Sequence, residues 1–87
     1  MRNLYHETLK TFFYSHLILQ RDSLGMTQVQ MARRLSMEER SYVSLEHGKT
    51  CCSGLTLAIY LIYCCDDPAS YLSELRAAFE QNDCIPV

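Results

Sequence analysis

The chain of 87 residues is poor in the features that mark several classes of protein. Its three glycines (Gly25, Gly48 and Gly54) are too few and too scattered to form a phosphate-binding loop, and no nucleophile–base arrangement is evident. No apolar run approaches the roughly 20 residues that a membrane-spanning helix needs. Glu7 and Lys10 precede the first aromatic run and no small-residue cleavage site follows, so we expect no signal peptide. We expect a cytoplasmic protein that is not an enzyme, has no cofactor and does not contact a membrane.

An excess of positive charge is also missing. The net charge is −2, whereas nucleic-acid-binding domains are usually basic. The acidic residues are unevenly placed, however, because residues 50–87 hold Arg76 as their one basic residue against five acidic ones (Asp66, Asp67, Glu74, Glu80 and Asp83). Residues 1–49 are slightly basic. A neutral-to-basic face therefore remains available in the first half of the chain.

Cysteine is present, but its pattern is not that of a disulfide framework. The five cysteines are an odd number, and four of them form the adjacent pairs Cys51–Cys52 and Cys64–Cys65. Neighbours in a helix project about 100° apart, and zinc ligands are usually separated by two to four residues. We expect Cys64 to be a core residue, the others to be loop or edge thiols, and Cys84 to be exposed. Metal binding or redox sensing is the less favoured alternative.

The hydrophobic residues repeat at helical spacing along most of the chain, and no strand pattern of comparable strength occurs. The spacing predicts an all-α fold of about five helices in a single domain over residues 1–87. Helices are expected at about 3–22, from 27, at about 38–47, after Ser53, and at about 68–81.

Capping residues mark the expected helix ends. Gly25 is suited to a left-handed cap, and Gly48 to a C-terminal stop. Thr27 with Gln30 three residues later is the sequence pattern of a capping box. Ser53 is a candidate cap, and Asp67 is followed by proline at the first helical position.

Residues 27–47 hold the most informative pattern. Apolar residues occur only where two short helices would cross, and the small Ala32 allows close packing; the large ones are Met31, Leu35, Met37, Tyr42 and Leu45. The other side presents Gln28, Glu39, Arg40, Val43, Ser44 and His47. This pattern is typical of a helix-turn-helix, which places its second helix in the major groove of DNA.

From Arg21 to Asp67 the chain resembles the lambda-repressor-like helix-turn-helix family, the Cro/repressor or Xre type of bacterial and phage regulator. The resemblance is carried by the entry 25–28 (GMTQ), by Ala32 and the spaced hydrophobic residues, by the exit 46–49 (EHGK), and by Thr56 and Leu57.

The resemblance implies roles for particular residues. Arg21 and Glu46 stand where the family has an ion pair that ties the first helix to the third. Gln28 matches the residue that contacts phosphate. Glu39, Arg40 and Ser44 match positions that reach base edges, and Arg40 is the best candidate because guanidinium can bind guanine O6 and N7 together. His47 and Lys49 are expected near the DNA backbone.

The sequence also departs from the family pattern. Glu38 replaces the usual Ser or Thr cap, and Glu38 with Glu39 would repel phosphate. Ser36 replaces the usual turn glycine, which leaves two alternatives. Either Ser36 adopts a left-handed conformation, or it caps the next helix early with Glu39 completing a capping box. The loop after residue 47 has few basic residues beyond Lys49.

These observations favour a transcriptional regulator that binds a double-stranded DNA operator as a homodimer, at the nucleoid. The dimer contacts are expected on the last helix (Leu72, Leu75 and Phe79) and on the surplus apolar face of the first. Four tyrosines are candidates for a partner surface: Tyr5, Tyr60, Tyr63 and Tyr71. The alternative is a protein-interaction module on the same scaffold, antitoxin-like or regulator-sequestering, with weak or no DNA binding.

Overall fold

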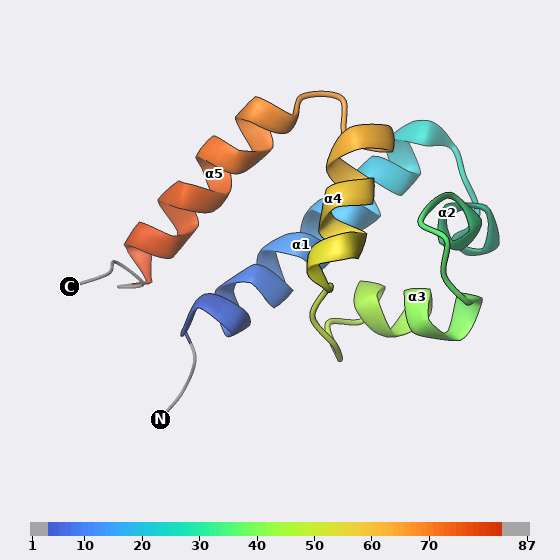
Figure 1. Ribbon diagram of the computed structural model, residues 1–87, viewed down its shortest axis with the longest axis horizontal. Coiled ribbons are helices and arrows are strands. Elements are labelled where there is room, and N and C mark those ends of the chain that lie inside the picture. The colour runs from blue at the N-terminus through green and yellow to red at the C-terminus, as the bar shows by residue number, and fades with distance from the viewer. Residues whose placement is uncertain (1–3, 83–87) are drawn as a thin grey trace.

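The computed structural model describes residues 4–82, which form five α-helices and no strand (Figure 1). The helices are α1 (Leu4–Leu24), α2 (Gln28–Arg34), α3 (Glu39–Glu46), α4 (Gly54–Tyr63) and α5 (Pro68–Gln81). The prediction of an all-α protein with about five helices is confirmed. Among the described residues, no helix is both long enough and apolar enough to cross a membrane.

The helix ends follow from local chemistry. The Thr27 hydroxyl accepts a hydrogen bond from the Gln30 N–H at 3.1 Å, and the Gln30 side chain accepts one from the Thr27 N–H at 2.9 Å. Ser53 and Asp67 cap α4 and α5 in the simpler way, each through one side-chain oxygen. Satisfying these N–H groups stabilises helix starts that would otherwise lose hydrogen bonds. The predicted caps are therefore confirmed.

Glycine is needed at the end of α3. Gly48 has φ +68°, and a Cβ atom built there would lie 3.1 Å from the ring of Tyr14 in α1. A side chain would meet both a strained backbone and an aromatic ring. The absence of a side chain at Gly48 lets the end of α3 lie directly against α1.

The turn between α2 and α3 adopts the first of the two predicted alternatives. Ser36 has φ 57°, the left-handed region, and does not cap α3. Instead Glu38 occupies the N-cap position, and its side chain makes no capping hydrogen bond. The second alternative, with Ser36 as an early cap, is wrong. A non-glycine residue in this conformation costs about 1–2 kcal/mol, so the turn holds unrelieved strain.

The core joins α2 and α3 to the middle of α1. Met31, Leu35 and Tyr42 are almost completely buried, as are Phe13 and Leu17 of α1. Ala32 and Leu45 complete the predicted apolar set, and Met37 packs at its margin. Tyr60 and Cys64 of α4 close the core, with the ring of Tyr60 edge-on to that of Phe13. The predicted packing between the two short helices is confirmed.

Helix α5 covers the first half of α1 (Figure 1). The rings of Phe79 and Tyr71 meet those of Tyr5 and Phe12 edge-on, at centroid distances of 5.0 Å each. Leu75 is buried in the same contact. The prediction that Leu75 forms a dimer contact is therefore wrong, because Leu75 is covered within the chain. Phe79 is partly buried against α1 and Leu72 is exposed, so their dimer contact stays a prediction. Tyr60 and Tyr71 were also expected at a partner surface, and both are buried.

Candidate nucleic-acid interface

An ion pair fixes the end of α3 against the end of α1. Arg21 donates from Nε to Glu46 Oε2 at 2.8 Å and from one terminal nitrogen to Oε1 at 3.0 Å. Its other terminal nitrogen donates to the Met26 carbonyl at 3.2 Å. A bidentate guanidinium–carboxylate pair restrains both distance and angle. The structure therefore brings Arg21 and Glu46 together, and their pairing restrains how α3 lies on α1.

The surroundings of this pair are protected from water. Glu46 is 5% exposed, whereas Arg21 reaches the surface. Hydrogen bonding to Glu46 raises the pKa of Arg21. Burial raises the pKa of Tyr42 well above its usual value, and the nearby Glu46 carboxylate raises it further. Both effects keep Arg21 charged and Tyr42 neutral.

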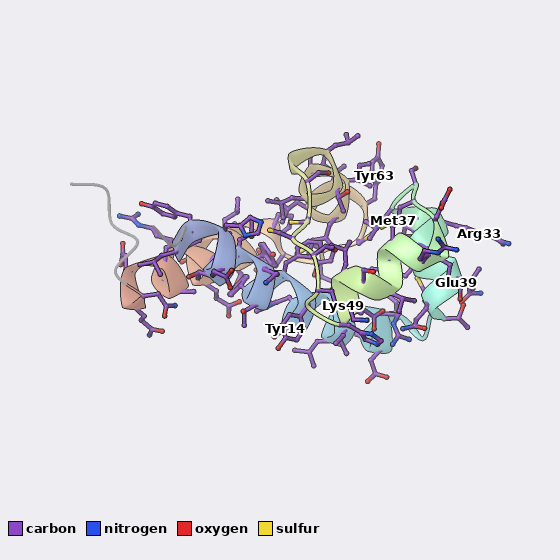
Figure 2. All side chains as sticks on the ribbon, turned by 90° about the horizontal axis from the view of Figure 1, so that it is seen from below. Tyr14, Arg33, Met37, Glu39, Lys49 and Tyr63 are labelled. Carbon is purple, nitrogen blue, oxygen red and sulfur yellow. The ribbon has the colours of Figure 1, made fainter. Side chains whose placement is uncertain are left out.

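The outward side of α3 is free of other helices. Glu39, Arg40 and His47 are exposed, and Ser44 is half-buried. Figure 2 views this side: α3 crosses the picture, Glu39 lies near its start, and Lys49 lies in the loop beyond its end. Five predicted site residues thus share one surface, which we name the α3 face (Glu39, Arg40, Ser44, His47 and Lys49).

A hollow of about 340 Å³ lies between α3 and the start of α4. It brings two predicted residues, Arg40 and Ser44, next to hydroxyl groups to which the sequence analysis assigned no role in binding. Its polar lining is Arg40, Ser41, Ser44, Thr50, Ser53 and Thr56, and its remaining lining is Met37, Leu45, Cys51 and Cys52. Hydroxyls both donate and accept hydrogen bonds. Only the placement of α4 beside α3 reveals this group, because its members are up to 16 residues apart.

Gln28 begins α2 and is half-buried. Within residues 4–82 its side chain makes no hydrogen bond, because the capping box uses Thr27 and Gln30. The amide is therefore available to a ligand. It belongs to a different helix from the α3 face.

The basic residues near α3 differ from those elsewhere in the described chain in their ion pairing. Lys10 and Arg76 form ion pairs with glutamates, as Arg21 does. By contrast, Arg40 and Lys49 form no ion pair with any of the described residues. The same holds for Arg34 and for Arg33, which projects outward from α2 in Figure 2. Glu38 and Glu39 likewise have no cationic partner within this part of the chain. The surface around α3 is thus of mixed charge, with unpaired cations as well as unpaired carboxylates.

The four described cysteines, Cys51, Cys52, Cys64 and Cys65, form no disulfide with one another. Cys64 is buried in the core, as predicted, and Cys51 and Cys52 are half-buried at the hollow. Burial, and then the neighbouring Cys51, raise the pKa of Cys52 to about 12. No group of three or more potential metal ligands gathers within the described range. The prediction for Cys84 falls outside the described residues.

Comparison of the chain with protein-family models, with curated proteins and with solved structures finds no match.

Proposed function

We propose that the protein is a transcriptional regulator that binds double-stranded DNA, with α2 and α3 as a lambda-repressor-like helix-turn-helix and α3 in the major groove. One observation carries the proposal. The Arg21–Glu46 pair anchors α3 on α1, while the opposite side of α3 keeps Arg40 exposed and has Ser44 half-buried at the open hollow. A recognition helix needs both a fixed angle and a free face.

The residues of the α3 face divide into two roles in this proposal. Arg40 reads a guanine through O6 and N7, and Ser44 contacts a neighbouring base edge. Glu39 is positioned to accept from a cytosine amine. Gln28, His47 and Lys49 contact phosphates and so set the register on the duplex without reading sequence. The hydroxyls of Ser41 and Thr50 at the hollow supply further neutral contacts to the backbone.

The small number of free cations supports dimeric binding. Four cations near α3 form no ion pair among residues 4–82: Arg33, Arg34, Arg40 and Lys49. With Arg40 reading a base, one copy neutralises about two or three phosphates. A single recognition helix with so few contacts gives little discrimination between sites. We therefore propose a homodimer on a two-fold-related operator, and a salt dependence about twice as steep as that of one copy.

An electrophoretic mobility shift with the DNA that flanks the protein's own gene tests this proposal. At low salt we expect a retarded complex that unlabelled specific DNA displaces better than random DNA. Arg76→Ala is the matched control, because Arg76 is exposed on α5 and pairs only with Glu80 among residues 4–82. The absence of any complex at low salt, with the protein folded, would exclude DNA binding to that region.

The second candidate is a protein-interaction module on the same scaffold. It is favoured by the two exposed carboxylates at the start of α3, Glu38 and Glu39, which would suit a basic partner. The variant Glu38→Gln separates the two functions and keeps Glu39, which is proposed to meet a cytosine amine. If α3 binds DNA, removing the Glu38 charge tightens binding because phosphate repulsion is relieved. If α3 binds a basic protein, the same variant weakens capture of that partner and DNA affinity stays negligible.

A further inference from the structure

Helix α4 is apolar on both of its sides. None of its ten residues, Gly54–Tyr63, is charged. The inward side packs on the core through Tyr60 and Leu57, and Cys64 continues that side. A helix at a protein surface normally carries polar residues on its outer side, so the composition of α4 calls for a second covering surface.

The outer side of α4 is uncovered. Leu55, Ile62 and Tyr63 are 72%, 69% and 68% exposed, and Ala58 is exposed between them. Leu55, Ala58 and Ile62 are spaced by three and four residues, which places them in one row along the helix. We name these four residues the α4 stripe (Leu55, Ala58, Ile62 and Tyr63). The stripe of α5 differs, because most of it is covered by α1.

We propose that the α4 stripe is the surface on which a second copy of this chain docks, with the two α4 helices side by side about a two-fold axis. A two-fold interface brings the same patch from both copies together, so the patch must be compatible with itself. A row of uncharged apolar side chains meets that requirement. It offers no charge that would select a differently charged partner.

The exposed area suits a small dimer. At the observed exposures the three large side chains of the stripe present on the order of 400 Å² per copy, or about 800 Å² for two copies, before a polar rim is added. This area lies below about 1,200 Å², the range of weak and transient interfaces. We therefore expect a reversible dimer with a dissociation constant in roughly the micromolar range.

The position of α4 relative to α3 also agrees with a dimer that binds DNA; this point rests on the proposed function. Figure 2 looks onto α3, and α4 with Tyr63 lies at one edge of that view. A two-fold axis running toward the viewer along this edge leaves both α3 helices facing the viewer. Two recognition helices on one side of the dimer are what adjacent major grooves require.

Analytical ultracentrifugation of the full chain over a range of concentrations tests the proposal. The wild-type protein should show a monomer–dimer equilibrium without larger species. Ile62→Glu places a carboxylate from each copy in the interface and should raise the dissociation constant at least about a hundredfold. Leu19→Glu is the matched control, since Leu19 is 67% exposed on α1, and it should leave the equilibrium unchanged. Helical circular dichroism checks that both variants are folded.

Three results would overturn the proposal: a wild-type protein that stays monomeric at several hundred micromolar, dimers that survive Ile62→Glu, or dimers lost in Leu19→Glu instead. DNA titrations of the same samples separate this proposal from the proposed function. A wild-type monomer that binds a half-site refutes the α4 dimer and leaves DNA binding standing. A dimer that is broken by Ile62→Glu but binds no DNA supports the α4 dimer and refutes the DNA-binding function.

Discussion

Replacing Arg21 with methionine removes the guanidinium that binds the buried Glu46 carboxylate, while keeping a side chain of similar length. The two hydrogen bonds at 2.8 and 3.0 Å disappear, and so does the bond to the Met26 carbonyl. Glu46 is 5% exposed, so water has little access to the carboxylate that is left behind. The variant therefore leaves a nearly buried charge without its partner.

The magnitude follows from this burial. Removing one partner of a buried pair typically costs about 3–5 kcal/mol. Because the Arg21 side chain is 25% exposed, some water can replace it, and we expect about 2–3 kcal/mol. A chain of this size has a total stability of about 4–13 kcal/mol. The variant should thus remain folded at 25 °C and melt about 10–20 °C lower.

Urea unfolding followed by circular dichroism measures this loss. Two further variants make the result specific. Arg21→Met with Glu46→Leu removes both charges and should cost only about 1 kcal/mol, because no uncompensated charge remains. Arg76→Met, on the exposed pair of α5, should change stability by less than about 0.5 kcal/mol. If Arg21→Met cost no more than Arg76→Met, the pair would not anchor α3 and the reasoning would be refuted.

Three other changes test the local chemistry by the same unfolding measurement. Ser36→Gly should stabilise the fold by about 1 kcal/mol, because glycine adopts φ 57° without strain; a loss of stability would contradict the left-handed turn. Glu38→Ser should add about 0.5–2 kcal/mol through a side-chain cap that Glu38 does not form, and an unchanged midpoint would count against a cap at this position. Stability should also fall above about pH 9, since groups whose pKa is raised in the folded state release protons first in the unfolded chain. A flat profile between pH 9 and 11 would contradict the burial of these groups (Cys52, Cys64, Tyr42, Tyr60 and Tyr71).

Local patterns in the sequence predicted much of the fold. The helix ends depend only on neighbouring residues, so the residue types there were enough to predict them. Examples are the Thr27–Gln30 capping box and the positive φ of Gly25 and Gly48. The apolar spacing of α2 and α3 predicted their contact, because packing these two helices together buries Leu35 and Tyr42.

The features that the sequence did not predict depend on distant parts of the chain. Periodicity indicated that Leu75 and Phe79 are covered, but could not say whether α1 or a second copy covers them. The conformation of Ser36 was undecided because both alternatives satisfied local rules. The hollow beside Arg40 required the position of α4, which no neighbouring residue determines.

We propose that α3 reads DNA through Arg40. A selection from random double-stranded DNA, followed by binding titrations, tests this role of Arg40. The wild-type protein should prefer guanine at one position of each half-site. Arg40→Ala should lose about 1–3 kcal/mol on the preferred site together with that preference. Gln28→Ala should weaken all sequences about equally, since a phosphate contact reads no base. If Arg40→Ala lowered stability and left DNA binding unchanged, Arg40 would belong to the structure, and the protein-interaction function would be preferred.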